Sequence, residues 1–181
     1  MNRKEAIELI ETNIKTKNLD KHMFAAEACM RRLASHFGED EDRWSMAGLL
    51  HDIDYDITKG DFSRHGVVSA EMLETAGVSG DIIDAIRAHA SKKDISSRME
   101  QALYAVDPLT GLIVASTLMH PAKKIGEVDV NFVMNRFKEK RFAAGADRAQ
   151  IKSCENMGVQ LEEFITICLN GMQEIAGEIG L

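Results

Sequence analysis

Apolar residues recur at helical spacing along almost the whole chain, and this pattern limits the fold more than any other feature. In one such segment, Ala25, Cys29 and Leu33 fall on the same side of a helix. The alternation of apolar and polar residues that is typical of strands is hard to find. Two prolines among 181 residues leave long segments uninterrupted. The sequence therefore predicts an all-α fold.

The helical segments follow one another without a repeat, a low-complexity tract or a linker, so they predict a single domain over residues 1–181. Hydrophobic residues make up 45% of the chain, which is enough for a substantial core. Asp20 is the expected N-cap of the second helix. A polar loop is expected over residues 54–64. Helices are predicted over residues 3–16, 20–36, 43–53, 65–77, 79–90, 98–119, 147–156 and 160–178.

The formal net charge of −7 limits the class of partner. An acidic surface is poorly suited to a long phosphate polymer, so we expect no nucleic-acid polymer as a partner. A small phosphorylated substrate is compatible with this charge, because one metal ion and a few Lys or Arg side chains can reverse the field locally.

Cysteine usage and hydropathy predict a cytoplasmic protein. Cys29, Cys154 and Cys168 are odd in number and form no CxxC pair, which is typical of reduced thiols packed as small hydrophobes. The N-terminus shows no apolar signal segment. The most apolar stretch, residues 102–119, contains Asp107 and several hydroxyls, and it is too short and too polar to span a bilayer. We therefore expect no membrane partner.

Four of the six histidines lie on predicted apolar helix faces or at helix ends. Asp107 lies in a run without Lys or Arg, where a buried carboxylate is costly unless a cation accompanies it. Nitrogen and oxygen ligands without a thiolate favour Fe, Mn, Co, Mg or catalytic Zn. Two ions bridged by Asp52 would use the whole set. The candidate metal ligands are His22, His51, Asp52, His65, His89 and Asp107.

Several of these residues also have a structural interpretation. A histidine such as His22, taken alone, is more often a core residue bonded to a carbonyl group. With a single bound ion, His65 and His89 would lie beside the metal or contact the substrate. Asp107 followed by Pro108 is equally typical of a helix start, with Asp as N-cap and Pro in the first turn. The combined series favours metal binding.

The series His22, His51-Asp52 and Asp107 resembles the signature of the HD superfamily of metal-dependent phosphohydrolases, which are all-helical. The resemblance covers about residues 20–115 and implies an HD-domain-like helical bundle. It also implies that these four residues hold one metal ion.

Two further histidines, His65 and His89, resemble the additional ligands of the HD branch that has binuclear, often iron-containing, sites. The resemblance implies a second ion at these histidines, with Asp52 bridging the two ions. The rest of the chain, from about residue 128 to residue 181, would then form a helical C-terminal extension to the bundle.

The chain departs from the family pattern directly after the HD pair. Many members read His-Asp-Ile-Gly-Lys, and their Lys helps to bind the phosphate, whereas this chain has Asp54-Tyr55 in place of Gly-Lys. Lys59 or Arg64, on the following loop, would then supply the positive charge. Lys92, which follows the last histidine closely, either faces solvent or binds phosphate.

The resemblance implies a hydrolase that cleaves a phosphate ester of a small molecule, with a nucleotide as the expected substrate. A water activated by one or two metal ions would attack, with Asp52 at the metal and Asp54 moving the proton. Two alternatives use the same residues: a di-iron oxygenase, and a metal-stabilised sensor or interaction domain without catalysis. The oligomeric state stays open, a homodimer included.

Overall fold

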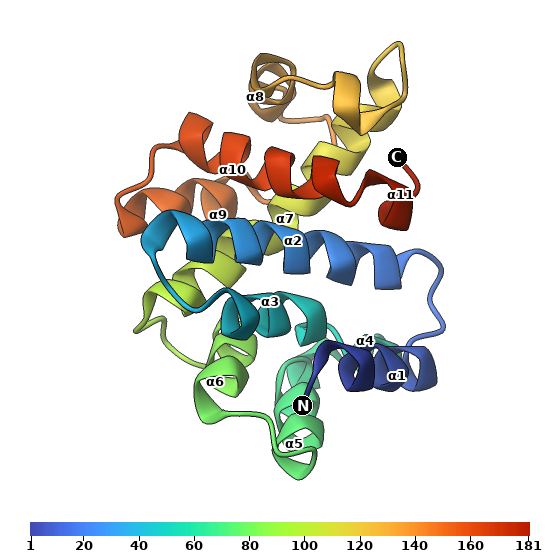
Figure 1. Ribbon diagram of the computed structural model, residues 1–181, viewed down its shortest axis with the longest axis vertical. Coiled ribbons are helices and arrows are strands. Elements are labelled where there is room, and N and C mark those ends of the chain that lie inside the picture. The colour runs from blue at the N-terminus through green and yellow to red at the C-terminus, as the bar shows by residue number, and fades with distance from the viewer.

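Helix α2 (Leu19–Phe37) is the central element of the computed structural model, which describes residues 1–181. It lies between α3 (Glu41–Leu50) and α10 (Leu161–Glu174) (Figure 1). Two glycines allow this close packing. A Cβ on Gly48 of α3 would lie 2.6 Å from the carbonyl oxygen of Ala26, and one on Gly171 of α10 would lie 2.7 Å from that of Ala28.

The chain contains helices and no strands, which confirms the predicted all-α fold. The remaining α-helices are α1 (Arg3–Asn13), α4 (Tyr55–Thr58), α5 (Val67–Thr75), α6 (Gly80–His89), α7 (Arg98–Met119), α8 (Val130–Lys138), α9 (Arg148–Lys152) and α11 (Ala176–Ile179). Three 3-10 helices join them: η1 (Phe62–Arg64), η2 (Ile125–Glu127) and η3 (Ser153–Met157).

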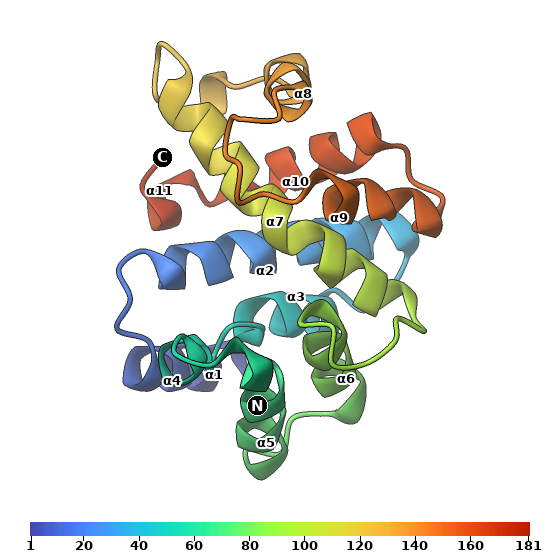
Figure 2. The same cartoon turned by 180° about the vertical axis from the view of Figure 1, so that it is seen from behind.

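Helix α7 crosses α2 on the face seen in Figure 2 and also packs against α6, α8 and α9. It is the one helix that is long and apolar enough to cross a membrane by length and composition, yet 56% of its most apolar window is buried inside the protein. Its place among four other helices makes it a core element of the bundle. The three cysteines are free and buried, as expected for core residues.

Helix α7 continues through Pro108, so Asp107 does not cap a helix. The helix begins instead at the N-cap Ser97, which forms a capping box with Glu100. A proline inside a helix leaves the carbonyl group four residues earlier without its usual donor. Here the side-chain amide of Gln150 donates to the carbonyl oxygen of Tyr104 at 2.8 Å. This long-range contact replaces the missing hydrogen bond.

Other boundaries also differ from the predicted ones. Asn18, in the left-handed conformation (φ 64°), precedes α2 in place of the expected cap Asp20. Helix α3 ends at Leu50, so His51 lies just beyond it as the C-cap residue. The predicted loop 54–64 contains both α4 and η1, and the extension contains a further helix, α8.

Candidate metal centre

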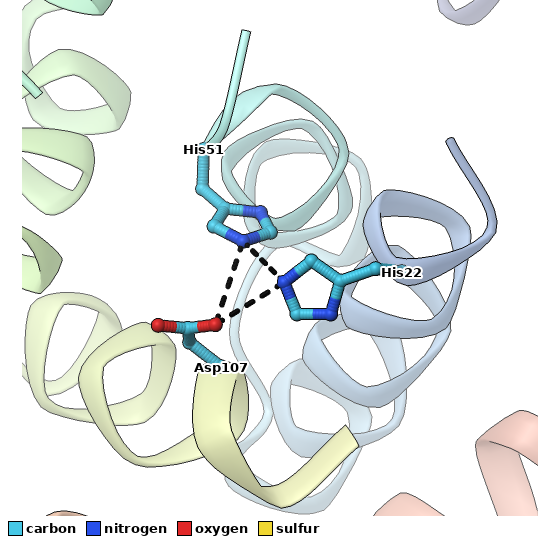
Figure 3. Close-up of side chains that lie close together, drawn as sticks. All are labelled: His22, His51 and Asp107. Carbon is cyan, nitrogen blue, oxygen red and sulfur yellow. Dashed lines mark hydrogen bonds and ion pairs between the residues drawn. The ribbon is translucent and has the colours of Figure 1, made fainter. Parts of the chain in front are cut away.

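All six predicted metal ligands converge at one point beneath α2. They come from different elements: His22 lies on α2, the HD pair directly follows α3, and the last ligand lies midway along α7. His65 follows η1, and His89 is the last residue of α6. Figure 3 shows the side chains of His22, His51 and Asp107 pointing toward one another.

The first half of the centre joins His22, His51 and Asp107. Nε2 of His22 lies 3.0 Å from Nε2 of His51 and 3.2 Å from Oδ1 of Asp107. Nε2 of His51 lies 3.8 Å from that same carboxylate oxygen. Asp52 closes this half, because its Oδ2 lies 3.6 Å from Nε2 of both histidines.

The second half uses the other oxygen of Asp52. Its Oδ1 lies 3.4 Å from Nε2 of His65 and 3.6 Å from Nε2 of His89. Each carboxylate oxygen of Asp52 therefore faces a different pair of imidazoles. This is the arrangement that a carboxylate bridging two cations requires.

The four imidazoles are all anchored through Nδ1. His51 and His89 contact the carbonyl oxygens of Gly48 and Ile86 at 2.8 and 2.5 Å. Since a carbonyl oxygen only accepts hydrogen bonds, Nδ1 carries the proton in both rings. In the neutral ring, Nε2 then keeps the lone pair that points into the centre.

His22 and His65 have the same tautomer for a related reason. The hydroxyl group of Thr110 donates to the carbonyl oxygen of Asp107, so its oxygen accepts from Nδ1 of His22 at 2.8 Å. Nδ1 of His65 donates to Oδ1 of Asp54 at 2.8 Å. Outer partners of this kind are typical of histidines that ligate metals.

The residues present fit a divalent cation. Four imidazole lone pairs and two carboxylates face one another, an arrangement that a positive ion would stabilise. Nε2 of His89 is buried and has no hydrogen-bond partner, which leaves it free for a ligand. Two groups of three potential ligands share His51: one with His22 and Asp107, the other with Asp52 and His89. These donors are nitrogen and oxygen atoms, as catalytic metal sites use.

The electrostatic field of the site also favours a cation. Burial alone would lower the pKa of His51, but the carboxylates of Asp52 and Asp107 outweigh this effect and raise the pKa to about 9. Burial would raise the pKa of Asp52, and the neighbouring histidines His51, His89 and His22 instead hold it well below its usual range. Positive charge is therefore stabilised at this point of the core.

Asp54 was predicted from the sequence to move the proton, and in the structure it contacts the Nδ1 side of His65. Its carboxylate is fully buried and accepts three hydrogen bonds, from Nδ1 of His65 and from the backbone amides of Gly66 and Ser69. Burial would raise the pKa of Asp54, but these contacts lower it. Asp54 thus lies behind His65 and orients that ring.

Thr110 orients His22 in the same way. It was not among the candidate residues, although its spacing three residues after Asp107 places it on the same face of the helix.

The three predicted phosphate-binding cations differ in their surroundings. The ammonium group of Lys59 lies 2.7 Å from Asp56 in an ion pair. Arg64 directly precedes His65 and is exposed, as is Lys92. The pKa of Asp61 is lowered mainly by its hydrogen bonds with Ser63. The positive charges of Arg64 and Lys92 also lower it. Arg64 and Lys92 therefore both lie near Asp61, and Lys92 also lies next to Gly66, since its Cγ would be 3.7 Å from a Cβ on that residue.

Comparison with known proteins identifies the family. The HD domain profile matches residues 19–147, more than half of the chain. The chain belongs to the HD domain family. This confirms the resemblance stated from the sequence and supports a hydrolase with a divalent metal. The match extends beyond the expected limit of residue 115 and includes α8.

The similar curated proteins are all named Ribonuclease Y. The protein of Oleidesulfovibrio alaskensis is 32% identical over 96 residues, and that of Geobacter sulfurreducens is 28% identical over the same length. In both cases the matched segment covers 53% of this chain and 18% of the relative. The chain therefore spans less than a fifth of these relatives. No solved structure gives a significant match.

Proposed function

We propose that this chain is a binuclear, metal-dependent phosphohydrolase that acts on nucleotides and short oligoribonucleotides. The observation that carries this proposal is the position of Asp52, whose two oxygens face separate imidazole pairs at 3.4–3.6 Å. Asp52 would bridge two ions. One ion would be held by His22, His51 and Asp107, and the other by His65 and His89. Bound divalent ions supply an activated water and neutralise phosphoryl oxygens.

Exposure indicates the direction from which substrate approaches. The side chains of His51 and His89 are 0% and 1% exposed, whereas those of His22 and Asp107 are 23% and 31% exposed. The centre is thus closed beneath α3 and α6 and open along α2 and α7. A phosphate group would enter over His22 and Asp107, while Arg64 and Lys92 supply positive charge beside His65.

A cavity of about 440 Å³ adjoins the open side and offers a place for the organic part of the substrate. It borders His22, and most of its lining surface is apolar, with contributions from Val114, Ala115 and Leu118 of α7, while Lys21 also lines it. This volume lies within the range of about 300–1,000 Å³ that is usual for small-molecule sites. Its apolar lining suits a nucleobase better than a second phosphate.

Two observations favour a short ribonucleotide. The relatives named Ribonuclease Y match about half of this chain, which supports an RNA-type phosphodiester as substrate. The net charge of −7 opposes a long polyanion. A substrate with one or a few phosphates satisfies both observations.

The experiment compares substrates of increasing length on protein with a measured metal content. Mononucleotides, dinucleotides, ten-residue RNA, long RNA and matched DNA are incubated with the wild type and with His51→Ala. His36→Ala, a histidine variant on the exposed far end of α2, is the control. We expect metal-dependent cleavage of the short ribonucleotides by the wild type and by the control variant, and none by His51→Ala.

Other outcomes overturn the proposal in distinct ways. Cleavage confined to long RNA would contradict the proposed substrate size. O₂ consumption by iron-loaded protein, without any phosphoester cleavage, would identify an oxygenase. Metal binding with neither reaction would identify a sensor or interaction domain.

A further inference from the structure

Asp54 is a fully buried carboxylate at a position where many HD proteins have glycine. Its two oxygens have separate partners. Oδ1 accepts from Nδ1 of His65 at 2.8 Å, and Oδ2 accepts from the backbone amides of Gly66 and Ser69 at 2.8 and 3.0 Å. Burying a carboxylate is costly, and three donors offset that cost.

His65 depends on this contact more than His51 and His89 depend on theirs. His51 and His89 are each anchored to a carbonyl oxygen three residues earlier, in or next to their own helix. His65 instead lies in the connection between η1 and α5, and its ring is fixed by a side chain from another element. An ionised carboxylate only accepts hydrogen bonds, so Nδ1 of His65 carries the proton and Nε2 faces Asp52 with a lone pair.

The second oxygen of Asp54 fixes the backbone on which His65 stands. Gly66 has a positive φ of 77°, and a Cβ at this position would lie 2.5 Å from the Cβ of Ala90, directly after α6. The amide hydrogen bonds to Oδ2 hold the start of α5 at Asp54, while the close contact of Gly66 with Ala90 holds it near the end of α6, where His89 lies. One carboxylate thus sets the orientation of the His65 ring and the place of the backbone next to it.

We propose that Asp54 is the positioning residue that creates the second metal position, by fixing His65 in the tautomer whose Nε2 can bind an ion. This inference rests on the binuclear centre of the proposed function. The replacement of the family glycine by Asp54 would then have a specific consequence. It supports the His65 and His89 half of the centre, and it leaves the His22, His51 and Asp107 half unaffected.

Asp54→Asn tests this inference because the two side chains have the same shape. The amide oxygen of Asn replaces Oδ2 and accepts from Gly66 and Ser69, so its NH₂ group faces Nδ1 of His65. That group donates, which places the histidine proton on Nε2 and blocks ligation. We expect a folded variant with one bound equivalent of Mn²⁺ or Co²⁺ in place of two, and a loss of about 10–100-fold in affinity for the second ion.

Equilibrium dialysis and elemental analysis give the metal content, and circular dichroism checks the fold. Ser69→Ala is the matched control, because it keeps the amide group and removes a buried hydroxyl that has no partner. It should retain two ions. The double variant His65→Ala with Asp54→Asn should bind as much metal as His65→Ala alone. An additional loss would show that Asp54 acts through the fold and not through His65.

Two results would overturn the role of Asp54: an Asp54→Asn variant that binds two ions with wild-type affinity, or a wild type that binds one. If Asp54→Asn fails to fold, ¹⁵N NMR of the wild type loaded with Zn²⁺ answers the same question. A proton on Nδ1 of His65 is expected, and one on Nε2 would contradict the inference. A wild type that binds two ions but cleaves no phosphoester would overturn the proposed function alone.

Discussion

Gly48 packs directly against the backbone of Ala26, so closely that a Cβ on residue 48 would lie 2.6 Å from the carbonyl oxygen of Ala26. This contact sets the distance between α3 and α2. It therefore also sets the distance between His51, just after α3, and His22 on α2. A backbone contact at one glycine thus determines the geometry of the first half of the centre.

Gly48→Ala is expected to destabilise the fold and weaken metal binding together. The new methyl group forces α3 away from α2, and overpacking of this kind costs about 1–3 kcal/mol in the free energy of unfolding. Urea unfolding and metal analysis measure the two effects. Gly177→Ala is the control, because no atom lies within 4 Å of its added Cβ. Equal behaviour of the two variants would show that the close contact is unimportant.

The number of bound ions should follow the geometry of Asp52. Asp52→Ala removes a ligand from both halves, and we expect it to lose both ions. His22→Ala and His89→Ala each affect one half, and each should retain one ion. Elemental analysis gives the number of bound ions in each variant. Added metal should raise the melting temperature most in the wild type, less in the variants that keep one ion, and not at all in Asp52→Ala. Retention of two ions by Asp52→Ala would exclude a bridging role.

Arg64 and Lys92 should affect substrate binding more than metal binding. Loss of a charged hydrogen bond to phosphate costs about 1.5–3 kcal/mol, so Arg64→Ala or Lys92→Ala should raise KM about tenfold or more while metal content is unchanged. Lys59→Ala is the matched control, since Lys59 is already paired with Asp56. Steady-state kinetics on a dinucleotide distinguish the three variants. If Lys59→Ala raised KM as much as Arg64→Ala and Lys92→Ala, a specific role of Arg64 and Lys92 in substrate binding would be contradicted.

Filling the cavity beside His22 should exclude the organic part of the substrate. Ala115→Phe places a large ring among the apolar residues that line it. We expect KM for nucleotides to rise while cleavage of a small phosphodiester such as bis(p-nitrophenyl) phosphate changes less, because the metal ligands remain in place. Ala149→Phe, at an exposed position of α9, provides the comparison. Unchanged nucleotide kinetics in Ala115→Phe would place the substrate elsewhere.

Asp56 should contribute stability that depends on pH. It accepts hydrogen bonds from the backbone amides of Lys15 and Thr16, and its contacts with Lys59 and Thr16 hold its pKa well below the ordinary value of 3.8. A lowered pKa in the folded state stabilises the protein above that ordinary value, and the contribution is lost as the pH falls below it. Asp56→Asn should therefore be less stable than the wild type at pH 7, and the difference should narrow near pH 3. Urea unfolding at both pH values measures this, and a constant difference would contradict it.

The helical periodicity was sufficient to predict the fold class, because each helix carries its apolar stripe in its own sequence. The six candidate ligands could be chosen for a similar reason: polar groups on apolar faces are rare and need a partner. Details that depend on contacts distant in the sequence were not accessible. The passage of α7 through Pro108 depends on Gln150, and the orienting role of Asp54 depends on the position of His65 after folding.

The two halves of the centre differ in how firmly their ligands are held. His22 and Asp107 lie on α2 and α7, and His51 directly follows α3, which the contact at Gly48 locks to α2, whereas His65 stands in a short connection between η1 and α5. Helices in direct backbone contact resist widening to admit a larger ion, while the connection that carries His65 is held by the hydrogen bonds of one side chain, Asp54. We therefore expect the first position to discriminate among ions by ionic radius, and the second to accept a broader range of them.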